Sequence, residues 1–447
     1  MNTVIKSRFD GCFEIEQIRQ RVTVRPEPIT DLSRILPVLA AAELVQRLKE
    51  IYLPNQFSLA FIQELVGRAD LFSRSVFTSE RDYQAKIYQP PNVEVTPICL
   101  TGLAGVGKSE TIAAVMKLLP TNIEFESSHF ADKVPLVSHW HASARDKARG
   151  KQLLADFLRD SVSAGKRTSA SQLLDMCRRL VYRQGVSLLF LDETQHIVKG
   201  QGTALVTDIL LTLARIGLPM IYLANYSLLH KLTDRNQEDT QRLLLQPRIM
   251  LPDDPAGEDW KAYVAECVRV SNGQIRANEE ELASELYTLT FGLKRLAVHL
   301  LGLAYIECRK AGRRHIALGD LSNAARSTEY SISNKEVVEL YRIAVEGPRG
   351  TKRKDLYCPL DIPAAHKSNV VQFARQERDE RVTALAIDSS LTLQEREALE
   401  QIESPSRSPR AKPPRRKPLP KATLEESQMT FAKYVEQLKS GKPKKPR

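Results

Sequence analysis

Two spacings of apolar residues divide this chain into a region of mixed strands and helices and a region of helices alone. Continuous β-branched and apolar runs at 93–100, 187–191 and 220–224 predict parallel strands that are buried on both faces. Apolar positions at helical spacing over 111–119 predict a helix directly after the first run. The alternating segment His139-Trp140-His141 predicts a further strand, which leaves little weight for the two histidines as metal ligands.

Helical periodicity dominates elsewhere. Segments 35–49 and 58–67 show it before the first strand, and 258–270, 278–289, 293–310 and 318–327 show it after the last one. We therefore expect five parts: an N-terminal extension over 1–90, an α/β core over 91–254, a helical lid over 255–346, a polar connector over 347–402 and a tail over 403–447.

The first strand and helix enclose a complete phosphate-binding motif, G-x-x-x-x-G-K-[ST]. Its glycines let backbone N–H groups converge on phosphate oxygens, and the helix adds its positive N-terminal end. Lys108 is expected to reach the β- and γ-phosphates, and Ser109 to ligate Mg²⁺. The residues expected to hold the nucleotide here are Gly102, Gly105, Val106, Gly107, Lys108, Ser109 and Glu110.

Polar residues follow the next two strands. Asp192 and Glu193 end the run at 187–191, at the edge of the sheet where ligands bind. We expect Asp192 to hold Mg²⁺ through water and Glu193 to polarise the attacking water; the alternative is that Asp192 only caps the next helix. Asn225 ends the run at 220–224 and is expected to orient that water, unless it merely starts a turn.

Composition indicates the size of the core and the expected cellular location of the protein. The 447 residues are 42% hydrophobic, which is enough for a sizeable core. Six cysteines without a C-x-x-C spacing favour a reducing cytosol over a zinc site or a disulfide framework. With no apolar signal core and no 18-residue apolar run, we expect a cytoplasmic protein that neither enters nor crosses a membrane.

The basic charge is concentrated at the C-terminus. Residues 403–447 hold 13 Lys and Arg against 4 Asp and Glu, a net charge of +9, which leaves +2 for the other 402 residues. The same segment has 8 of the 24 prolines, and such a stretch is typical of a disordered tail. Apolar positions over 424–439 predict a short helix that docks on a partner; a merely solubilising tail is the alternative.

The order of phosphate loop, acidic strand, polar-tipped strand and all-helical segment is the layout of an AAA+ ATPase. We therefore expect an α/β fold: an AAA+ P-loop parallel sheet with a helical lid, a helical N-terminal extension and a disordered basic C-terminal tail. Segment 191–196, L-D-E-T-Q-H, resembles the D-E-x-Q-H signature of AAA+ transposition regulators of the TnsC/TniB family. Segment 292–295, G-L-K-R, resembles the family's lid motif, and I-Y-L-P at 51–54 resembles the TnsC entry region.

This resemblance implies that ATP and Mg²⁺ bind between subunits and that Arg295 contacts the phosphates. ATP would drive subunits into rings or helical filaments on duplex DNA, and the assembly would bring a transposase to a site chosen by a target-selector protein. A neighbouring subunit must then supply an arginine finger. Arg248, in a segment similar to the family's R-F-x-L-P pattern but with Ile249 in place of Phe, is favoured over Arg242; the alternative is a surface arginine without a partner.

DNA binding is expected to be electrostatic and independent of base sequence. The resemblance places it near the basic cluster Arg145, Lys147, Arg149 and Lys151, with Lys166 and Arg167 as the second candidates. Each cluster has the alternative of a solvated helix face. Because the body of the chain is nearly neutral, we expect modest DNA affinity without ATP-driven assembly.

The function that these features favour is a regulatory ATPase that assembles on target DNA and activates a transposase. A P-loop signalling switch that acts without DNA is one alternative. A helicase loader or replication initiator of the same fold is another, although an initiator usually has a winged-helix DNA reader after its lid, and the Pro-rich sequence beyond 347 leaves little room for one.

Overall fold

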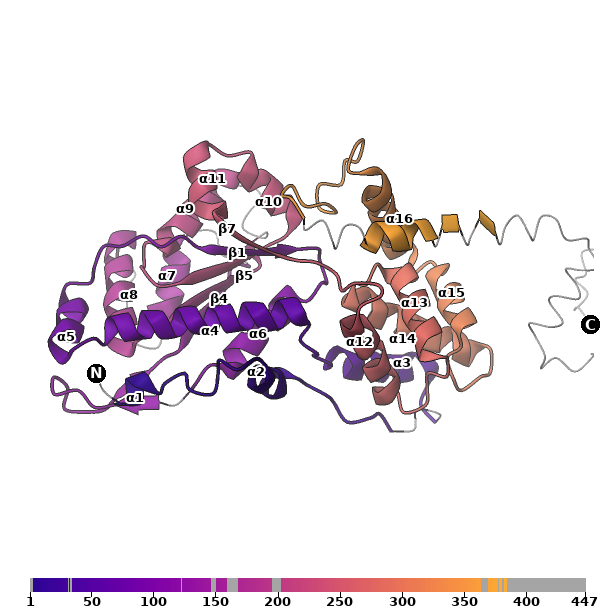
Figure 1. Ribbon diagram of the computed structural model, residues 1–447, viewed down its shortest axis with the longest axis horizontal. Helices are drawn as coiled ribbons and strands as arrows, with labels where there is room; N and C mark the ends of the chain where they lie inside the picture. The colour runs from indigo at the N-terminus through magenta and orange to yellow at the C-terminus, as the bar shows by residue number, and fades with distance from the viewer. Residues whose placement is uncertain are drawn as a thin grey trace, which may run out of the picture. The chain divides into compact units, whose positions relative to one another are not determined.

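The core of the protein is a parallel five-stranded sheet with the strand order β4-β5-β6-β1-β7 (Figure 1). The computed structural model describes residues 3–30, 32, 34–121, 123–145, 150–158, 168–194, 202–362, 369–376, 378–379 and 382–383. The strands of this sheet are β1 (Ile98–Gly102), β4 (His139–Ser143), β5 (Leu188–Asp192), β6 (Met220–Ala224) and β7 (Gln246–Met250). Two shorter strands, β2 (Ile123–Phe125) and β3 (Val134–Leu136), form an antiparallel pair beside it.

The three predicted central strands are present, but the first begins later than its apolar run predicts. β1 starts at Ile98, so Val93 and Val95 lie outside the sheet, and Val95 N–H donates instead to Ala214 O. Pro97 has no N–H to give to a ladder, which explains why pairing starts after it. β6 matches its predicted range, β5 is shifted by one residue, and β4 confirms the predicted strand at His139.

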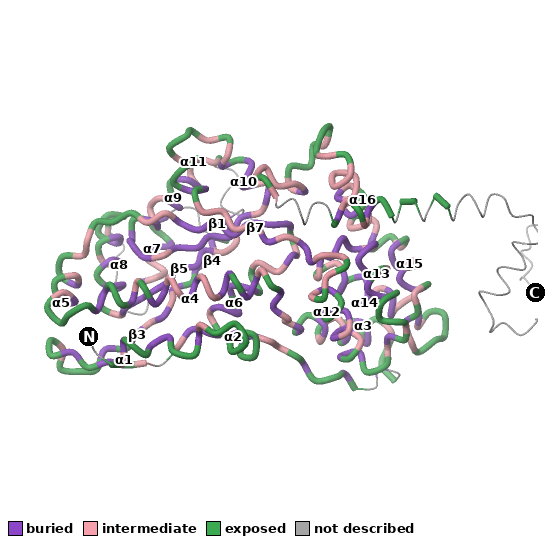
Figure 2. Tube along the Cα trace, in the orientation of Figure 1, coloured by how far each residue is buried: buried purple, intermediate pink, exposed green. Residues whose placement is uncertain are grey.

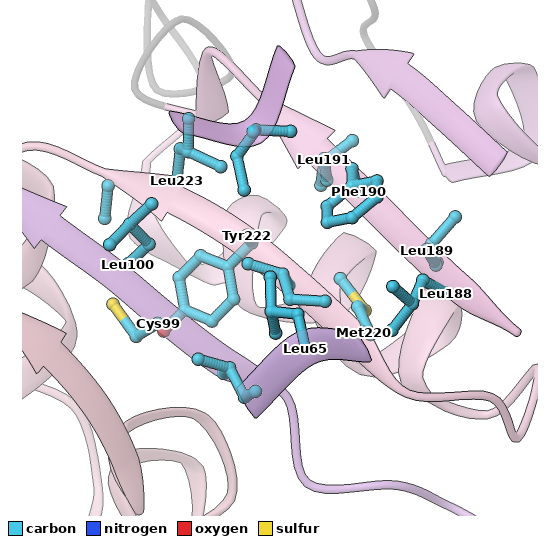
Figure 3. Packing of buried hydrophobic residues seen from close by; sticks show 14 of the residues in the cluster. Leu65, Cys99, Leu100, Leu188, Leu189, Phe190, Leu191, Met220, Tyr222 and Leu223 are labelled. Atoms are coloured by element: carbon cyan, nitrogen blue, oxygen red, sulfur yellow. The ribbon is translucent and has the colours of Figure 1, made fainter. Parts of the chain in front are cut away.

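Helices cover both faces of the sheet. Because crossovers between parallel strands are right-handed as a rule, this strand order places α6 on one face and the helices that connect β4 to β7 on the other. The core helices are α6 (Lys108–Leu118), α7 (Gly150–Leu158), α8 (Ala170–Gln184), α9 (Thr203–Ala214), α10 (Tyr226–Thr233) and α11 (Gln237–Leu244). Figure 3 shows Leu65, from a helix of the N-terminal region, among the side chains of the sheet with Cys99 and Tyr222.

The N-terminal region packs on two different parts of the molecule. Its helices are α1 (Thr3–Lys6), α2 (Ile15–Val22), α3 (Pro37–Lys49), α4 (Gln56–Val76) and α5 (Glu80–Tyr88). Helices α2 and α4 contact α6 on the sheet, whereas α3 packs against lid helix α14. The long α4 begins where the Asn55 side chain caps it by accepting a hydrogen bond from Ser58 N–H.

The lid is a helical unit with its own core of buried aromatic and aliphatic side chains, among them Trp260, Tyr287 and Tyr305. Figure 2 shows buried stretches of the chain trace in this unit. It contains α12 (Glu258–Val270), α13 (Glu279–Thr290), α14 (Lys294–Lys310), α15 (Leu318–Ala325) and α16 (Ser331–Glu346). The first four confirm the predicted lid helices, with ends that differ by at most two residues. Phe291 and Gly292, both with positive φ, end α13 and turn the chain into α14.

Within the described residues, no single helix is long and apolar enough to cross a membrane. The two helices α13 and α14 together have the length and apolar composition of a membrane span, but the pair is bent by 109°. The chain divides into two compact units, residues 1–380 and residues 381–447. The predicted basic tail and its terminal helix lie outside the described residues.

Candidate nucleotide-binding site

A cavity of about 500 Å³ opens where the phosphate loop, the ends of β5 and β6, the N-terminal region and the lid meet. This is the carboxyl edge of the parallel strands, where open α/β sheets bind ligands. The predicted site residues that line it are Gly105, Val106, Gly107, Lys108, Ser109, Glu110, Asp192, Glu193, Asn225 and Arg295. Side chains from separate parts of the sequence therefore form one site.

The shape of the phosphate loop depends on glycine at two positions in particular. A Cβ on Gly102, whose φ is +159°, would lie 2.3 Å from Met250 O on the neighbouring strand. A Cβ on Gly105, whose φ is +84°, would lie 2.9 Å from the Cβ of Arg295. The loop can therefore lie against both β7 and the lid only because these side chains are absent.

Lys108 is a largely buried cation held by the loop itself. Its Nζ donates to Gly102 O and Leu103 O, each at 2.8 Å. Burial, and then the nearby charge of Arg295, lowers the pKa of Lys108 to about 8. Asp192 is close enough to act on the charge of Lys108, but among the described residues no carboxylate forms a salt bridge with its ammonium group. An anion such as a triphosphate therefore fits the electrostatics of the cavity.

The acidic pair follows β5, but its second member is engaged by neighbouring side chains. Asp192 Oδ1 accepts a hydrogen bond of 2.6 Å from Glu193 N–H. Glu193 has φ 55°, a left-handed conformation that costs a non-glycine residue about 1–2 kcal/mol. Its carboxylate accepts a hydrogen bond of 2.8 Å from Ser143 Oγ and lies 3.9 Å from Arg145 Nη1. A strained backbone beside a phosphate loop is typical of a functional position.

Asn225 combines the two roles that the sequence left open. Its Oδ1 accepts hydrogen bonds from Leu228 N–H at 2.9 Å and Ser227 Oγ at 3.0 Å, so it caps α10. It also lines the cavity, where its amide group is available to a water molecule.

The lid and the N-terminal region are joined next to the cavity through one buried carboxylate. Asp253 follows β7; its Oδ1 accepts a hydrogen bond of 2.6 Å from Asn55 Nδ2, and its Oδ2 lies 3.0 Å from Lys294 Nζ. Its backbone carbonyl also accepts from Tyr287 OH at 3.2 Å. Because Lys294 directly precedes Arg295, this junction sets the position of the lid arginine relative to the phosphate loop.

Sequence reasoning missed much of the cavity wall. Leu48 comes from α3, and Tyr52 and Leu53 come from the segment between α3 and α4. Tyr263 and Val298 come from the lid. The I-Y-L-P segment carried a family resemblance but no predicted contact. Ser143, the hydrogen-bond donor to Glu193, lies two residues beyond the strand predicted at 139–141, and nothing in the sequence was a reason to select it.

The predicted arginine finger and DNA-binding residues lie elsewhere. Arg248 is on β7 and forms a two-point salt bridge with Glu64 of α4, while Arg242 on α11 pairs with Glu238 and Glu94. Neither arginine lines the cavity. Arg145 and Lys151 are exposed at the surface. Outside the described residues lie Lys147, Arg149, Lys166, Arg167 and His196.

Oxygen ligands in the cavity fit a magnesium ion. The Ser109 hydroxyl is exposed there, and Asp192 has a carboxylate oxygen not used by Glu193 N–H. Such hard oxygen donors, together with phosphate oxygens, are the ligands that Mg²⁺ prefers. Across the described part of the chain, no group of three or more His, Cys, Asp or Glu side chains forms an all-protein metal site.

This geometry defines a P-loop nucleotide-binding protein. A family model described as "AAA domain" matches residues 95–232, which include the phosphate loop, β5 and β6. The chain therefore has an AAA domain within an AAA+ P-loop fold, with the phosphate loop and acidic strand of an ATPase. No curated protein matches the chain.

The solved structures to which this chain is similar share little sequence identity with it. Drosophila ORC bound to DNA is 14% identical, with a TM-score of 0.40, and 87% of this chain and 90% of that chain are covered. The Aeropyrum pernix ORC2 protein in its ADPNP–ADP complexes is 12% identical, with a TM-score of 0.39 and coverages of 71% and 94%. The Thermotoga maritima RuvB Holliday junction branch migration motor is 12% identical, with a TM-score of 0.32 and coverages of 63% and 77%.

Proposed function

We propose that this chain is an ATP-dependent, DNA-binding regulator of DNA transposition. It assembles on target duplex DNA when ATP is bound and brings a transposase to a site chosen by a target-selector protein. The ATPase part of the proposal is carried by one observation: Lys108, Asp192, Glu193 and Arg295 line one cavity. The transposition part is carried by the D-E-x-Q-H resemblance at 191–196 and the G-x-x-R resemblance that ends at Arg295.

In this proposal each residue of the cavity has a distinct task. Lys108 leaves the loop carbonyls and binds the β- and γ-phosphates, which replaces two neutral acceptors by an anion. Arg295 holds the phosphates from the lid side. Ser109 and Asp192 hold Mg²⁺, and Glu193 orients and polarises the attacking water. Arg248 of one subunit reaches the γ-phosphate bound by the next.

The contact of Glu193 with Arg145 suggests how DNA controls hydrolysis. Arg145 belongs to the predicted DNA-binding cluster, and its guanidinium lies 3.9 Å from the Glu193 carboxylate. The Arg145 side chain is 64% exposed and the ion pair is long, so the pair is weak and a DNA phosphate can compete for the arginine. We propose that DNA draws Arg145 away and leaves Glu193 Oε1, the oxygen that Ser143 does not contact, free to act on water.

Assembly would then depend on the γ-phosphate. ATP joins the cavity of one subunit to an arginine of its neighbour, and hydrolysis removes the group that both sides bind. We also propose that the parts of the chain end at residues 90, 254, 346 and 402. Residues 424–439 would form a helix that docks on a partner.

Electron microscopy of the full chain with duplex DNA tests the proposal, first with a non-hydrolysable ATP analogue and then with ADP. We expect rings or filaments on DNA with the analogue only. Lys108→Ala should abolish them, whereas Lys117→Ala, an exposed lysine on the same helix, should not. Glu193→Gln with ATP should give longer assemblies on DNA.

Other outcomes point to other functions. Nucleotide-dependent assembly that ignores DNA would favour a signalling switch. In this proposal each subunit contacts DNA phosphates weakly, and ATP-driven assembly makes many such contacts act together. Strong DNA binding without nucleotide, measured on a chain that ends at residue 346, would contradict it. Retention of a replicative helicase would favour a loader.

A further inference from the structure

Arg248 is held in a defined orientation by two hydrogen bonds from its guanidinium to one carboxylate. Its Nε donates to Glu64 Oε2 at 2.9 Å and its Nη2 donates to Glu64 Oε1 at 2.7 Å. Its Nη1 donates to Pro247 O at 3.1 Å. Three of the five guanidinium N–H groups are therefore used. Within the part of the chain that the structure describes, Nη1 and Nη2 each keep one N–H group without a hydrogen-bond partner.

Glu64 is itself fixed on the rigid part of the molecule. It lies on α4, next to Leu65, which is fully buried against the sheet. Arg68, one turn further along α4, donates to the same carboxylate from Nε at 3.0 Å and from Nη2 at 2.8 Å. Burial acts to raise the pKa of Glu64, but the hydrogen bonds from Arg248 and Arg68 outweigh it and lower the pKa below its usual value. Glu64 therefore stays charged.

The charge and the solvent exposure of Arg248 are those expected of a residue that contacts another molecule. One carboxylate between two guanidinium groups leaves a net positive charge, and 33% of the Arg248 side chain is exposed to solvent. Arg248 lies on β7, the edge strand of the sheet, and not in the cavity of its own subunit. Since Arg248 does not line the cavity of its own subunit, the γ-phosphate that it would contact is one bound by a neighbouring subunit.

We infer that Glu64 is a positioning residue for Arg248. The carboxylate holds the guanidinium from its Nε side, so that the two remaining N–H groups are oriented toward the γ-phosphate in a neighbouring subunit. This inference rests on the proposed role of Arg248 in the function above. An arginine already held in place loses less side-chain freedom when it binds, and this is worth about two- to tenfold in rate for one long side chain.

Mixed assemblies test the inference, because the arginine and the nucleotide site that it serves belong to different subunits. The acceptor subunit carries Arg248→Ala and keeps an intact cavity. The donor subunit carries Glu193→Gln, so it binds ATP and keeps Arg248 but does not hydrolyse. ATPase activity that appears only in the mixture reports Arg248 supplied by the donor.

Glu64→Gln is then placed in either the donor or the acceptor. We expect the donor variant to lower kcat of the mixture up to about tenfold with KM for ATP unchanged, and the acceptor variant to have no effect. Glu339→Gln in the donor is the matched control, since Glu339 forms an equivalent two-point pair with Arg342, at 2.8 Å from both Nε and Nη2, on a helix away from the cavity. Thermal unfolding of each subunit alone checks that the fold is retained.

Three results would overturn the role of Glu64 while leaving Arg248 as the finger: no loss from the donor variant, a gain from it, or equal losses from donor and acceptor. The gain would mean that Glu64 restrains Arg248, and equal losses would mean that the pair is structural. If the mixture without a Glu64 variant shows no activity above that of its separate components, the finger role of Arg248 itself is wrong, and the role of Glu64 falls with it.

Discussion

Nucleotide affinity should depend on pH through Lys108. In the nucleotide-free protein, burial and the charge of Arg295 lower the pKa of this lysine to about 8. Among the described residues, its ammonium group donates to two backbone carbonyls and to no carboxylate. A bound triphosphate favours the charged form and raises that pKa again. Binding is therefore coupled to uptake of a proton whenever the pH is above about 8.

The size of the effect follows from the lowered pKa. Below pH 8 the lysine is already charged and affinity is at its full value. Above pH 8 the free protein must be protonated before it binds, which weakens affinity about tenfold, or ~1.4 kcal/mol, for each pH unit. We expect Kd for a non-hydrolysable ATP analogue to rise about tenfold between pH 7 and pH 9. The same shift makes the nucleotide-free fold more stable as the pH rises through 8, because the unfolded chain then binds more protons than the folded one.

Titration of a fluorescent ATP analogue from pH 7.5 to 9.5 measures this directly. Lys108→Arg is the matched control, because arginine stays charged over the whole range and should give a nearly constant Kd. Arg295→Ala should move the break to higher pH, since the charge of Arg295 contributes to the lowered pKa. A Kd that is flat across the range in the unmodified protein would refute the reasoning.

Three further predictions follow from the packing around the cavity and the lid. Gly105→Ala places a methyl group 2.9 Å from the lid arginine's Cβ at φ +84°, so affinity for the ATP analogue in a binding titration should fall at least about tenfold while the thermal unfolding midpoint changes little. Gly302→Ala places a Cβ 2.5 Å from Val45 Cγ2 and should destabilise the protein by about 1–3 kcal/mol in urea unfolding; Val45→Ala in the same chain should recover most of the loss. Asn55→Ala removes the cap of α4 and a hydrogen bond to buried Asp253, and should cost about 2–3 kcal/mol in the same assay; a loss under about 0.5 kcal/mol would mean that the junction contributes little.

The phosphate loop and the central strands could be predicted because their determinants are local. Glycine spacing sets the loop, and a continuous apolar run marks a strand that is buried on both faces. The run at 93–100 shows the limit of this signal: hydrophobicity alone predicted a strand from Val93, whereas pairing begins at Ile98, after the one residue without an N–H. The lid helices were predictable because their apolar positions recur at helical spacing. Among the four predicted lid helices, α13 is the one whose N-cap side chain caps its start, with Asn278 accepting from Glu280 N–H.

The sequence by itself determined that a phosphate loop, an acidic strand end and a helical lid exist in this chain, because each depends on residues that are near neighbours along it. Only the tertiary structure decided which distant residues meet them. The pairing of Glu193 with Ser143, of Asp253 with Asn55 and of Arg248 with Glu64 joins positions 50 or more residues apart. Such contacts depend on how the helices and the sheet pack, and neither the period nor the spacing of residues along the chain records that.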